Sequence, residues 1–527
     1  MDALGYVWLG ILAVFQGPEA FALLGVGVSV TLVMVCAGFL LGIVVGATPG
    51  LGGPIAMAIS LPILILAFGF TPDALLPVMG FLIGIMKGAT IGGAVPAILF
   101  NTPGTPDSYM TTLDGYPMAM KGQARRALRI AHLSSASGDT FSDIVLILCA
   151  PFLALMVEAY LDLPEKTALL ILSLSFIAAV VGGSPGKGLI SAGLGLLAVY
   201  LGTGEDFYPR LSMGTQTLNR GFPIAAAVLG VLILGTVFHQ MAQGHADRLR
   251  PSGDAKTPDQ DADRALSWPE VRSLMPTILR SSVIGTVIGA LPGIGSTLAA
   301  TIGYTSAKAR HDRHSPPEAT AFGTGAPRGI AATEAANSSV SGANLIPVLS
   351  LGIPGNTAAV FLILAAESIG GFNPGPSVFR FTTDQVNPEL VVAFGLFTCM
   401  FVANLMNWTV GGVFMRSMGF LARVPRHRLL PVVLVLTLTA IYVQETRMEA
   451  VWFTLGFGVL GFGMRLVGMS PLPFVIAFIL GAKLEDSARQ AFSATGGDPW
   501  FLFTSPVAAV FMALSVLVVV LGARRRP

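Results

Sequence analysis

GIVVGATPGLGGPIA (residues 42–56) decides the fold, because it recurs without gaps as GTVIGALPGIGSTLA at residues 285–299. Eight of the 15 aligned positions are identical, far more than unrelated segments share. Each copy carries a Pro-Gly pair inside a long apolar stretch. Proline removes a backbone N–H and glycine tolerates a positive φ, so each pair predicts an interruption of a helix.

The composition of the chain indicates a membrane protein. Of its 527 residues, 53% are hydrophobic and only 11% are charged, and the mean hydropathy is +0.73. Repeated apolar runs of about 20 residues are each long enough to cross a hydrocarbon core of about 30 Å. We therefore expect an all-α polytopic membrane protein of about 12 spans. The 62 glycines and 35 prolines favour close helix packing and broken helices or re-entrant hairpins.

A second Pro-Gly pair follows in each half of the chain. Pro103-Gly104 and Pro354-Gly355 each lie at the same spacing after another proline, Pro96 or Pro347. The chain is therefore predicted to contain two repeats separated by a linker. The predicted parts are a first transmembrane half at 1–244 (repeat core about 21–128, scaffold 129–243), a cytoplasmic linker at 245–275, and a second transmembrane half at 276–527 (repeat core about 276–370, scaffold 389–523).

The basic residues predict that the two repeats have opposite orientations. After its first interruption, the first half reaches the uncharged or acidic loop 69–73, whereas the second half reaches the basic segment 308–313. After the second interruption the signs exchange, because the first half then reaches the basic segment 121–129. Lys and Arg concentrate on the cytoplasmic side of membranes, so equivalent loops lie on opposite sides, as in inverted-repeat transporters. A parallel duplication stays open, because the charges in each loop are few.

The N-terminus predicts a retained first segment on the non-cytoplasmic side. No Lys or Arg precedes Lys87, and the first residues lack the basic region and the cleavage site of a signal peptide. Residues 4–16 are short enough that they can instead lie at the membrane interface.

The four interruptions are expected to converge on one site. Unwound helices expose carbonyls for a cation and N–H groups for an anion, and neutral polar side chains surround the second pair in each half. We expect no buried permanent charge in this pocket. The alternatives are simple kinks, packing contacts, helix caps and interhelical hydrogen bonds. The predicted substrate and cation site comprises Pro49, Gly50, Gly52, Asn101, Thr102, Pro103, Gly104, Thr105, Pro292, Gly293, Gly295, Asn337, Ser338, Pro354, Gly355, Asn356 and Thr357, with Lys87 as a further candidate.

Two ionisable residues, Lys87 and Glu334, allow two interpretations each. Lys87 lies among apolar residues, where it can pair with an anionic substrate or snorkel to the interface. Glu334 can bind a cation or a proton, or it can pair with Arg328. Asp139 and Asp143 lie four residues apart near the predicted start of a span, where capping and interfacial solvation suffice to explain them.

The composition argues against several other functions. Cys36, Cys149 and Cys399 lie in apolar runs without paired spacing, and the six histidines are scattered. We expect no resident metal, no cofactor and no nucleic-acid partner. An enzyme is not expected, because neither a nucleophile with a base nor a metal cluster is found at a suitable spacing. A channel or a structural subunit without coupled transport stays the alternative, although a channel favours a continuous polar lining.

Six motifs resemble one family, the large membrane subunit (TctA) of tripartite tricarboxylate transporters. They are GATPGLGG (46–53), PAILFNTPGTP (96–106), LDGYPMAMKGQARRAL (113–128), GALPGIGS (289–296), TEAANSS (333–339) and IPVLSLGIPGN (346–356). The resemblance implies a multi-pass permease of the bacterial inner membrane. It also implies two partners, a small four-span membrane subunit and a periplasmic solute-binding protein.

The resemblance further implies secondary uptake of organic carboxylates by alternating access, with sodium as the coupling ion. The chain departs from the family pattern at three positions. Many members have Tyr where Lys87 stands, Asn where Ser338 stands, and Pro or Ser where Thr333 stands. These departures leave the scaffold untouched, but they do not allow citrate to be named as the substrate.

Overall fold

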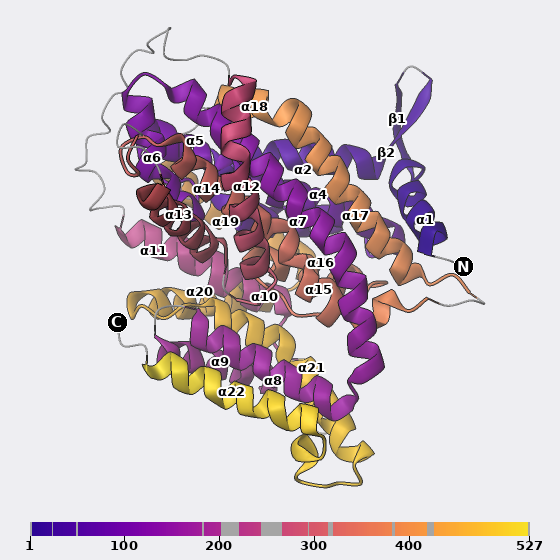
Figure 1. The fold of residues 1–527 in the computed structure, drawn as a ribbon. Helices are drawn as coiled ribbons and strands as arrows, with labels where there is room; N and C mark the ends of the chain where they lie inside the picture. Colours follow the sequence, from indigo (N-terminus) through magenta and orange to yellow (C-terminus); the bar gives the residue numbers. More distant parts are fainter. Residues whose placement is uncertain are drawn as a thin grey trace. The chain divides into compact units, whose positions relative to one another are not determined.

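The computed structural model describes residues 3–23, 25–48, 51–181, 184–201, 221–243, 266–293, 295–314, 320–381, 385–418 and 426–524. These residues are mainly helical, as predicted (Figure 1). The described part also contains an antiparallel hairpin, β1 (Glu19–Leu23) with β2 (Val26–Ser29), which the all-α prediction did not include. Most of the predicted linker, residues 245–265, and the loop 203–220 lie outside the described residues.

The chain divides into two compact units, and each unit contains residues from both halves of the sequence. The first unit comprises residues 1–154, 249–291 and 295–428, and the second comprises 155–248, 292–294 and 429–527. The elements of the first unit are α1 (Ala3–Phe15), β1, β2, α2 (Val30–Gly46), α3 (Gly52–Phe68), α4 (Pro72–Gly92), α5 (Ala94–Phe100), η1 (Pro106–Ser108), α6 (Tyr109–Met120), most of α7 (Ala124–Tyr160), α12 (Trp268–Gly289), α13 (Gly295–His314), α14 (Pro327–Ala343), α15 (Leu345–Leu351), α16 (Thr357–Ile369), η5 (Pro376–Phe379), α17 (Pro388–Met406), η6 (Asn407–Gly411) and α18 (Gly412–Ser417).

The second unit is a separate helical assembly, in which α8, α9, α21 and α22 lie side by side (Figure 1). Arg465 donates hydrogen bonds to the carbonyl oxygens of Val231 (2.8 Å) and Leu232 (3.0 Å), which lie in a π-helical turn. The elements of the second unit are the end of α7, α8 (Leu163–Val180), α9 (Pro185–Tyr200), α10 (Ile224–Val228), η3 (Leu229–Leu234), α11 (Gly235–Gln243), α19 (Arg426–Glu445, which begins in the first unit), α20 (Met448–Leu466), α21 (Leu472–Ala494), η8 (Phe501–Phe503) and α22 (Pro506–Arg524).

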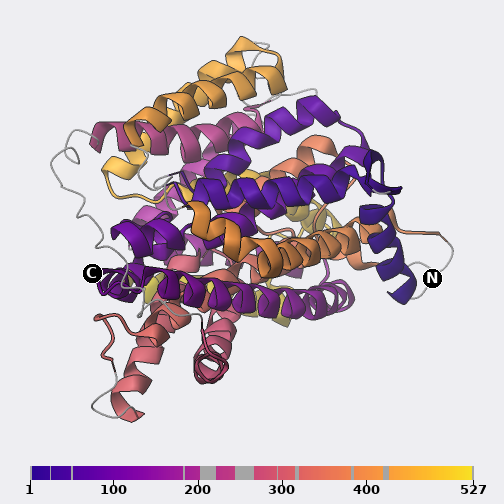
Figure 2. The same ribbon diagram turned by 90° about the horizontal axis from the view of Figure 1, so that it is seen from above.

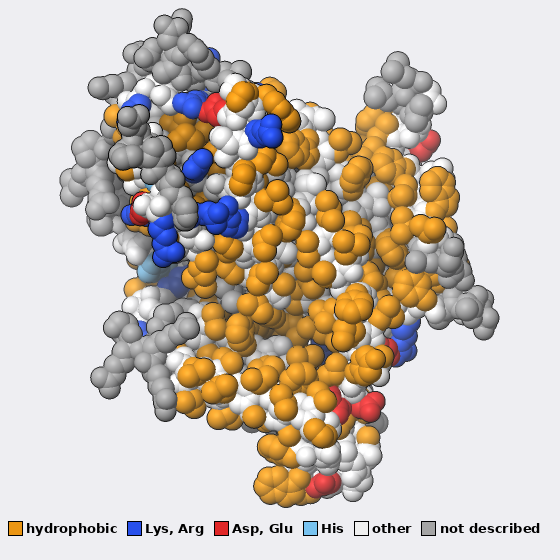
Figure 3. All heavy atoms as spheres, in the orientation of Figure 1, with side chains coloured by type: hydrophobic (Ala, Val, Ile, Leu, Met, Phe, Trp, Pro, Cys, Tyr) orange, Lys and Arg blue, Asp and Glu red, His pale blue; other side chains and the backbone are white. Residues whose placement is uncertain are grey.

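The helices have the lengths and surfaces of membrane-spanning segments. Within the described residues, five helical segments are long and apolar enough to cross a bilayer, and shorter apolar helices accompany them. The five are Pro72–Phe100, Ala124–Tyr160, Leu163–Val180, Ile224–Gln243 and Pro388–Ser417. Large apolar side chains of α7, α12 and α17, such as Leu148 (68% exposed) and Phe401 (65% exposed), form a broad hydrophobic surface (Figure 3). The expected dozen spans and the side of the N-terminus stay predictions.

Close packing of α2 against α4 forms the centre of the first unit. A Cβ atom added to Gly42 would lie only 2.6 Å from the carbonyl oxygen of Ile85, and one added to Gly88 would overlap the carbonyl oxygen of Phe39. The two backbones are therefore in contact, as small-residue stripes allow in membrane helices. The long α7 is also seen from two directions in Figures 1 and 2.

The second half repeats this contact between α12 and α14. The sequence repeat aligns Gly42 with Gly285, and the spacing from Pro96 and Pro347 aligns Ile85 with Ala336. A Cβ atom added to Gly285 would overlap the carbonyl oxygen of Ala336. Equivalent glycines therefore contact equivalent turns of the partner helix in both halves. The opposite orientation of the two halves in a membrane stays a prediction.

Candidate functional site

The second interruption of the first half begins where α5 ends. Asn101 adopts a left-handed conformation (φ 50°), and its N–H donates to the carbonyl oxygen of Pro96. The N–H of Thr102 donates to the same oxygen at 3.2 Å. The helix therefore ends in a tight left-handed turn, and Pro103 and Gly104 leave it in a non-helical conformation.

The second half contains the same turn. At the position that matches Asn101, Gly352 ends α15 with φ 71°. The N–H of Ile353 donates to the carbonyl oxygen of Pro347 at 3.1 Å, as Thr102 does to Pro96. Pro354 and Gly355, both buried, then lead to α16. The predicted interruptions at both second Pro-Gly pairs are therefore present, with matching backbone hydrogen bonds.

The first interruptions also match where they are described. α2 and α12 end with equivalent bonds, from the N–H of Ala47 to the carbonyl oxygen of Ile43 (2.9 Å) and from that of Ala290 to that of Thr286 (3.0 Å). The next helices begin at Gly52 (φ 64°) and Gly295 (φ 76°). Two predicted residues, Pro49 and Gly50, lie outside the described residues. Two others, Pro292 and Gly293, belong to the second compact unit and are not placed relative to the rest.

Contacts within the first unit join several of these interruptions. Gly104 packs against Gly46, the last residue of α2, and against Gly93. A Cβ atom on Gly52 would lie 3.8 Å from Cγ2 of Thr105. The interruptions of the first half therefore lie together. A site that joins all four interruptions stays a prediction.

One hydrogen bond links the two halves beside these turns. The hydroxyl of Thr297, in the first turn of α13, donates to the Asp107 carboxylate at 2.6 Å. α13 follows the first interruption of the second half, and Asp107 follows the second interruption of the first half. Residues that flank interruptions of different halves are therefore in contact.

Several polar residues near the breaks have local roles. Asn356 caps α16 by accepting from the N–H of Ala359 at 2.8 Å, one residue before Thr357 begins the helix. The hydroxyl of Thr102 donates to the carbonyl oxygen of Phe100, and those of Thr105 and Ser108 share a hydrogen bond at 3.0 Å. Capping and local hydrogen bonds therefore account for these side chains in the structure described here.

Among the buried polar side chains with unpartnered atoms are three of the segment that leads to the second break of the second half. Nδ2 of Asn337, Oγ of Ser338 and both amide atoms of Asn344 are without hydrogen-bond partners, and each residue is at most 2% exposed. Asn344 contacts the second break, because a Cβ atom on Gly355 would lie 2.8 Å from Asn344 Oδ1. Unpaired buried polar groups are costly, so these atoms are available to a ligand or to water.

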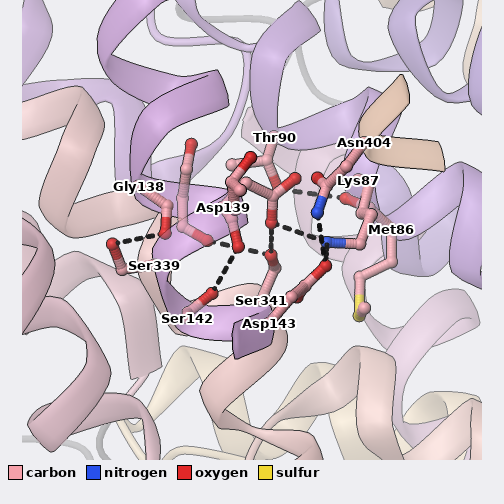
Figure 4. A network of polar contacts seen from close by, with 12 residues as sticks. Met86, Lys87, Thr90, Gly138, Asp139, Ser142, Asp143, Ser339, Ser341 and Asn404 are labelled. Atoms are coloured by element: carbon pink, nitrogen blue, oxygen red, sulfur yellow. Dashed lines mark hydrogen bonds and ion pairs between the residues drawn. The ribbon is translucent and has the colours of Figure 1, made fainter. Parts of the chain in front are cut away.

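Lys87 is fully buried between two carboxylates (Figure 4). Its Nζ lies 2.8 Å from Asp139 Oδ1 and 2.8 Å from Asp143 Oδ2. The snorkelling interpretation of Lys87 is therefore wrong, as is interfacial solvation of the two aspartates, which are 2% and 4% exposed. The reason is that the two aspartates, one turn apart on α7, face into the bundle toward α4. The ammonium already has two carboxyl partners, which leaves it poorly suited to bind a substrate carboxylate.

Glu334 is buried in α14 and does not pair with Arg328, which is exposed. Its carboxylate accepts hydrogen bonds from the hydroxyls of Thr111 and Ser135, the latter at 3.0 Å. The prediction of an Arg328 partner was therefore wrong. The absence of a buried permanent charge from the pocket at the four interruptions stays a prediction.

Asp114 is a buried residue that the sequence reasoning missed. Its Oδ1 accepts hydrogen bonds from the backbone N–H groups of Gly323 (2.8 Å), Gly325 (2.9 Å) and Ala326 (2.8 Å). Its Oδ2 accepts from the Tyr304 hydroxyl at 3.0 Å. The carboxylate thus holds the segment before α14 and lies at the positive N-terminal end of that helix. Its position in the LDGYP motif was the available signal.

Comparisons with known proteins agree with the motifs. A family model described as the tripartite tricarboxylate transporter TctA family matches residues 32–476. The chain is 32% identical over 501 residues to an uncharacterized 52.8 kDa protein of the TAR-I ttuC' 3' region of Agrobacterium vitis, covering 94% of this chain and 93% of that protein. It is also 29% identical over 242 residues to a protein of the TAR-II ttuC' 3' region of the same organism, covering 45% of this chain and 93% of that one.

No solved structure matches the chain significantly. The family match extends through most of both repeats and includes both second Pro-Gly pairs. This multi-pass membrane protein therefore belongs to the tripartite tricarboxylate transporter TctA family, as one subunit of a transporter with several components.

Proposed function

We propose that the chain is the large permease subunit of a binding-protein-dependent secondary transporter that imports organic carboxylates. A small four-span membrane subunit and a periplasmic solute-binding protein complete the transporter in the bacterial inner membrane. Tricarboxylates and related di- and monocarboxylates form the substrate class. The family membership supports the assignment to transport.

The observation that carries this proposal is the pair of matching left-handed helix ends. Both second Pro-Gly pairs follow a proline whose carbonyl oxygen accepts the same backbone hydrogen bond, at 3.2 Å and 3.1 Å. Such breaks in membrane helices direct free backbone groups toward substrates and ions in secondary transporters. The unpartnered atoms of Asn337, Ser338 and Asn344 add neutral donors and acceptors.

The proposed mechanism is alternating access. The binding protein delivers a carboxylate to the outward face, and the interruptions of the two inverted repeats hold it together with sodium. The repeat-derived core then moves against the remaining helices and exposes the site to the cytoplasm. Uncharged protein groups suit alternating access, because no uncompensated charge stays buried in the protein when the substrate and sodium leave together.

Uptake into proteoliposomes tests this function. The chain is reconstituted with its small subunit, and radiolabelled di- and tricarboxylates are added with the purified binding protein, with or without an inward sodium gradient. We expect uptake that requires the binding protein and increases with the gradient. Uptake that ignores every cation gradient would refute coupled transport and favour a channel.

Two substitutions test the role of the breaks. Leucine at Gly104 must displace Gly46 and Gly93, because even a Cβ atom would lie 2.9 Å from the Cα atom of Gly93. We expect Gly104→Leu and Gly355→Leu to insert normally and to lose uptake. Gly193→Leu is the control, because a Cβ atom at this exposed glycine of α9 has nothing within 4 Å. Unimpaired uptake in both break variants would show that transport does not depend on these breaks.

A further inference from the structure

The cluster around Lys87 holds more carboxylates than ammonium groups. The side chains of Lys87, Asp139 and Asp143 are 0%, 3% and 6% exposed. If both aspartates were ionised, the cluster would carry one uncompensated negative charge. Burying such a charge away from water is strongly unfavourable, so the cluster requires one further positive charge.

Two acceptors of this cluster lack donors. They are Oδ1 of Asp143 and Oδ1 of Asn404, whose residues are 4% and 6% exposed. Each aspartate has one oxygen that accepts two hydrogen bonds, Asp139 Oδ1 from Lys87 and Ser341 and Asp143 Oδ2 from Lys87 and Asn404. Of these two described carboxyl groups, Asp143 is the one whose other oxygen is buried without a partner. The missing positive charge is therefore best placed at Asp143.

The contact between Asp143 and Asn404 suits a shared proton. Asp143 Oδ2 lies 2.6 Å from the Asn404 amide (Figure 4), which is short for N–H···O and ordinary for O–H···O. The oxygen and nitrogen of an amide exchange places by a half-turn of the side chain. A protonated Asp143 can thus donate to the Asn404 oxygen that otherwise has no donor.

The packing leaves little room for a metal ion on the free side of Asp143. A Cβ atom added to Gly342 of α14 would overlap Asp143 Oδ1, so this helix backbone lies directly against the carboxyl group. The ammonium of Lys87 already lies between the two aspartates. A metal ion needs several oxygen ligands around it, whereas a proton needs one oxygen and no additional volume.

The hydrogen bonds that the two carboxyl groups accept in the described residues come from Lys87, Ser341 and Asn404, so no second cation is among their donors. On α14, Glu334 is itself acidic and bonds to hydroxyls. On α7, His132 bonds to the carbonyl oxygen of Asn407. α2 and α17 contribute the thiols of Cys36 and Cys399, and Glu389 lies in the first turn of α17.

We propose that Asp143, with Lys87, Asp139 and Asn404, forms a proton-binding site in which one proton is bound to Asp143 at neutral pH. The proton comes from water, forms an O–H bond to the carboxylate, and makes the cluster electrically neutral. The inference goes beyond carboxylate import, because it concerns a bound proton and because Asp139, Asp143 and Asn404 were not among the predicted substrate and cation residues. Its test requires no transport.

Infrared difference spectroscopy of the purified chain in lipid nanodiscs tests this site. We expect the wild-type spectrum minus that of Asp143→Asn to show, at pH 7, the carbonyl stretch of a protonated carboxyl group, shifted in D₂O. Asp73→Asn, in the exposed first turn of α4, should leave this band unchanged. An absent band, or one that disappears when sodium replaces choline, would overturn the proposal in favour of an ionised carboxylate that binds a metal ion.

Two further variants separate proton binding from a merely structural role. Asp139→Asn should abolish the band, because Lys87 then balances an ionised Asp143. Asn404→Leu should keep the band but move it to higher frequency, because the carboxyl group loses its amide partner. Size-exclusion chromatography confirms the fold of each variant. A band that persists in Asp139→Asn would contradict the charge balance on which the inference depends.

Discussion

Replacing Asp114 by alanine should destabilise the first unit, because four donors lose one acceptor group. Gly323 is exposed, so its N–H can bond to water, whereas Gly325 and Ala326 are buried. Leaving a buried donor unpaired costs about 1–3 kcal/mol. Two such N–H groups and the Tyr304 hydroxyl therefore predict a loss of about 4 kcal/mol, which is large against a typical folding free energy of about 5–15 kcal/mol.

Thermal unfolding in detergent, followed by the loss of the monodisperse size-exclusion peak, measures this effect. We expect the apparent Tm of Asp114→Ala to fall by at least about 5 °C. Asp114→Asn should lose less, because its amide oxygen still accepts from the two buried N–H groups, although without the additional strength of a charged acceptor. Asp312→Ala, at an exposed position of α13, is the control and should change stability by less than about 0.5 kcal/mol. An unchanged Tm in Asp114→Ala would refute the assignment of these hydrogen bonds as a structural clamp.

Further predictions concern the contacts of α4. Gly88→Leu should reduce stability by about 3 kcal/mol, because its side chain must separate α4 from the backbone of α2; a Tm equal to that of Gly193→Leu would contradict the close contact. Lys87→Met should lower the Tm by leaving the buried, ionised Asp139 without a cation beside a protonated Asp143, and adding Asp139→Asn should restore most of the loss. If the double variant is no more stable than Lys87→Met, the charge balance described for this cluster is wrong.

The sequence predicted features that depend on local chemistry. Proline and glycine act on the backbone where they stand, so the helix ends near Pro103 and Pro354 follow from the residues alone. The spacing of Gly42 from Gly46, and of Gly84 from Gly88, contained a signal for the packing of α2 on α4. In each case the sequence signal lies within a few neighbouring residues.

The sequence did not predict the partners of the buried charges. The carboxylates that bind Lys87 lie more than 50 residues away on α7, and a spacing of four residues in Asp139 and Asp143 shows only that they share a helix face. Asp114 bonds mainly to backbone N–H groups, which are present at almost every residue and leave no pattern in a sequence. Such partners become visible only when the folded chain brings them together.

The comparison of the two halves separates what the repeated backbone does from what individual side chains do. The alignment that matches Pro96 with Pro347 also matches Lys87 with Ser338. At one of these equivalent positions an ammonium is held by two aspartates from α7, which follows the first repeat core. At the other a small hydroxyl is buried with no partner. Because the backbones around the two positions make the same contacts, the difference in charge comes from the side chains alone. The shared backbone therefore supplies the helix breaks, whereas the side chains at the two equivalent positions differ in chemistry: a charged cluster surrounds Lys87, and a neutral, unpaired hydroxyl stands at Ser338.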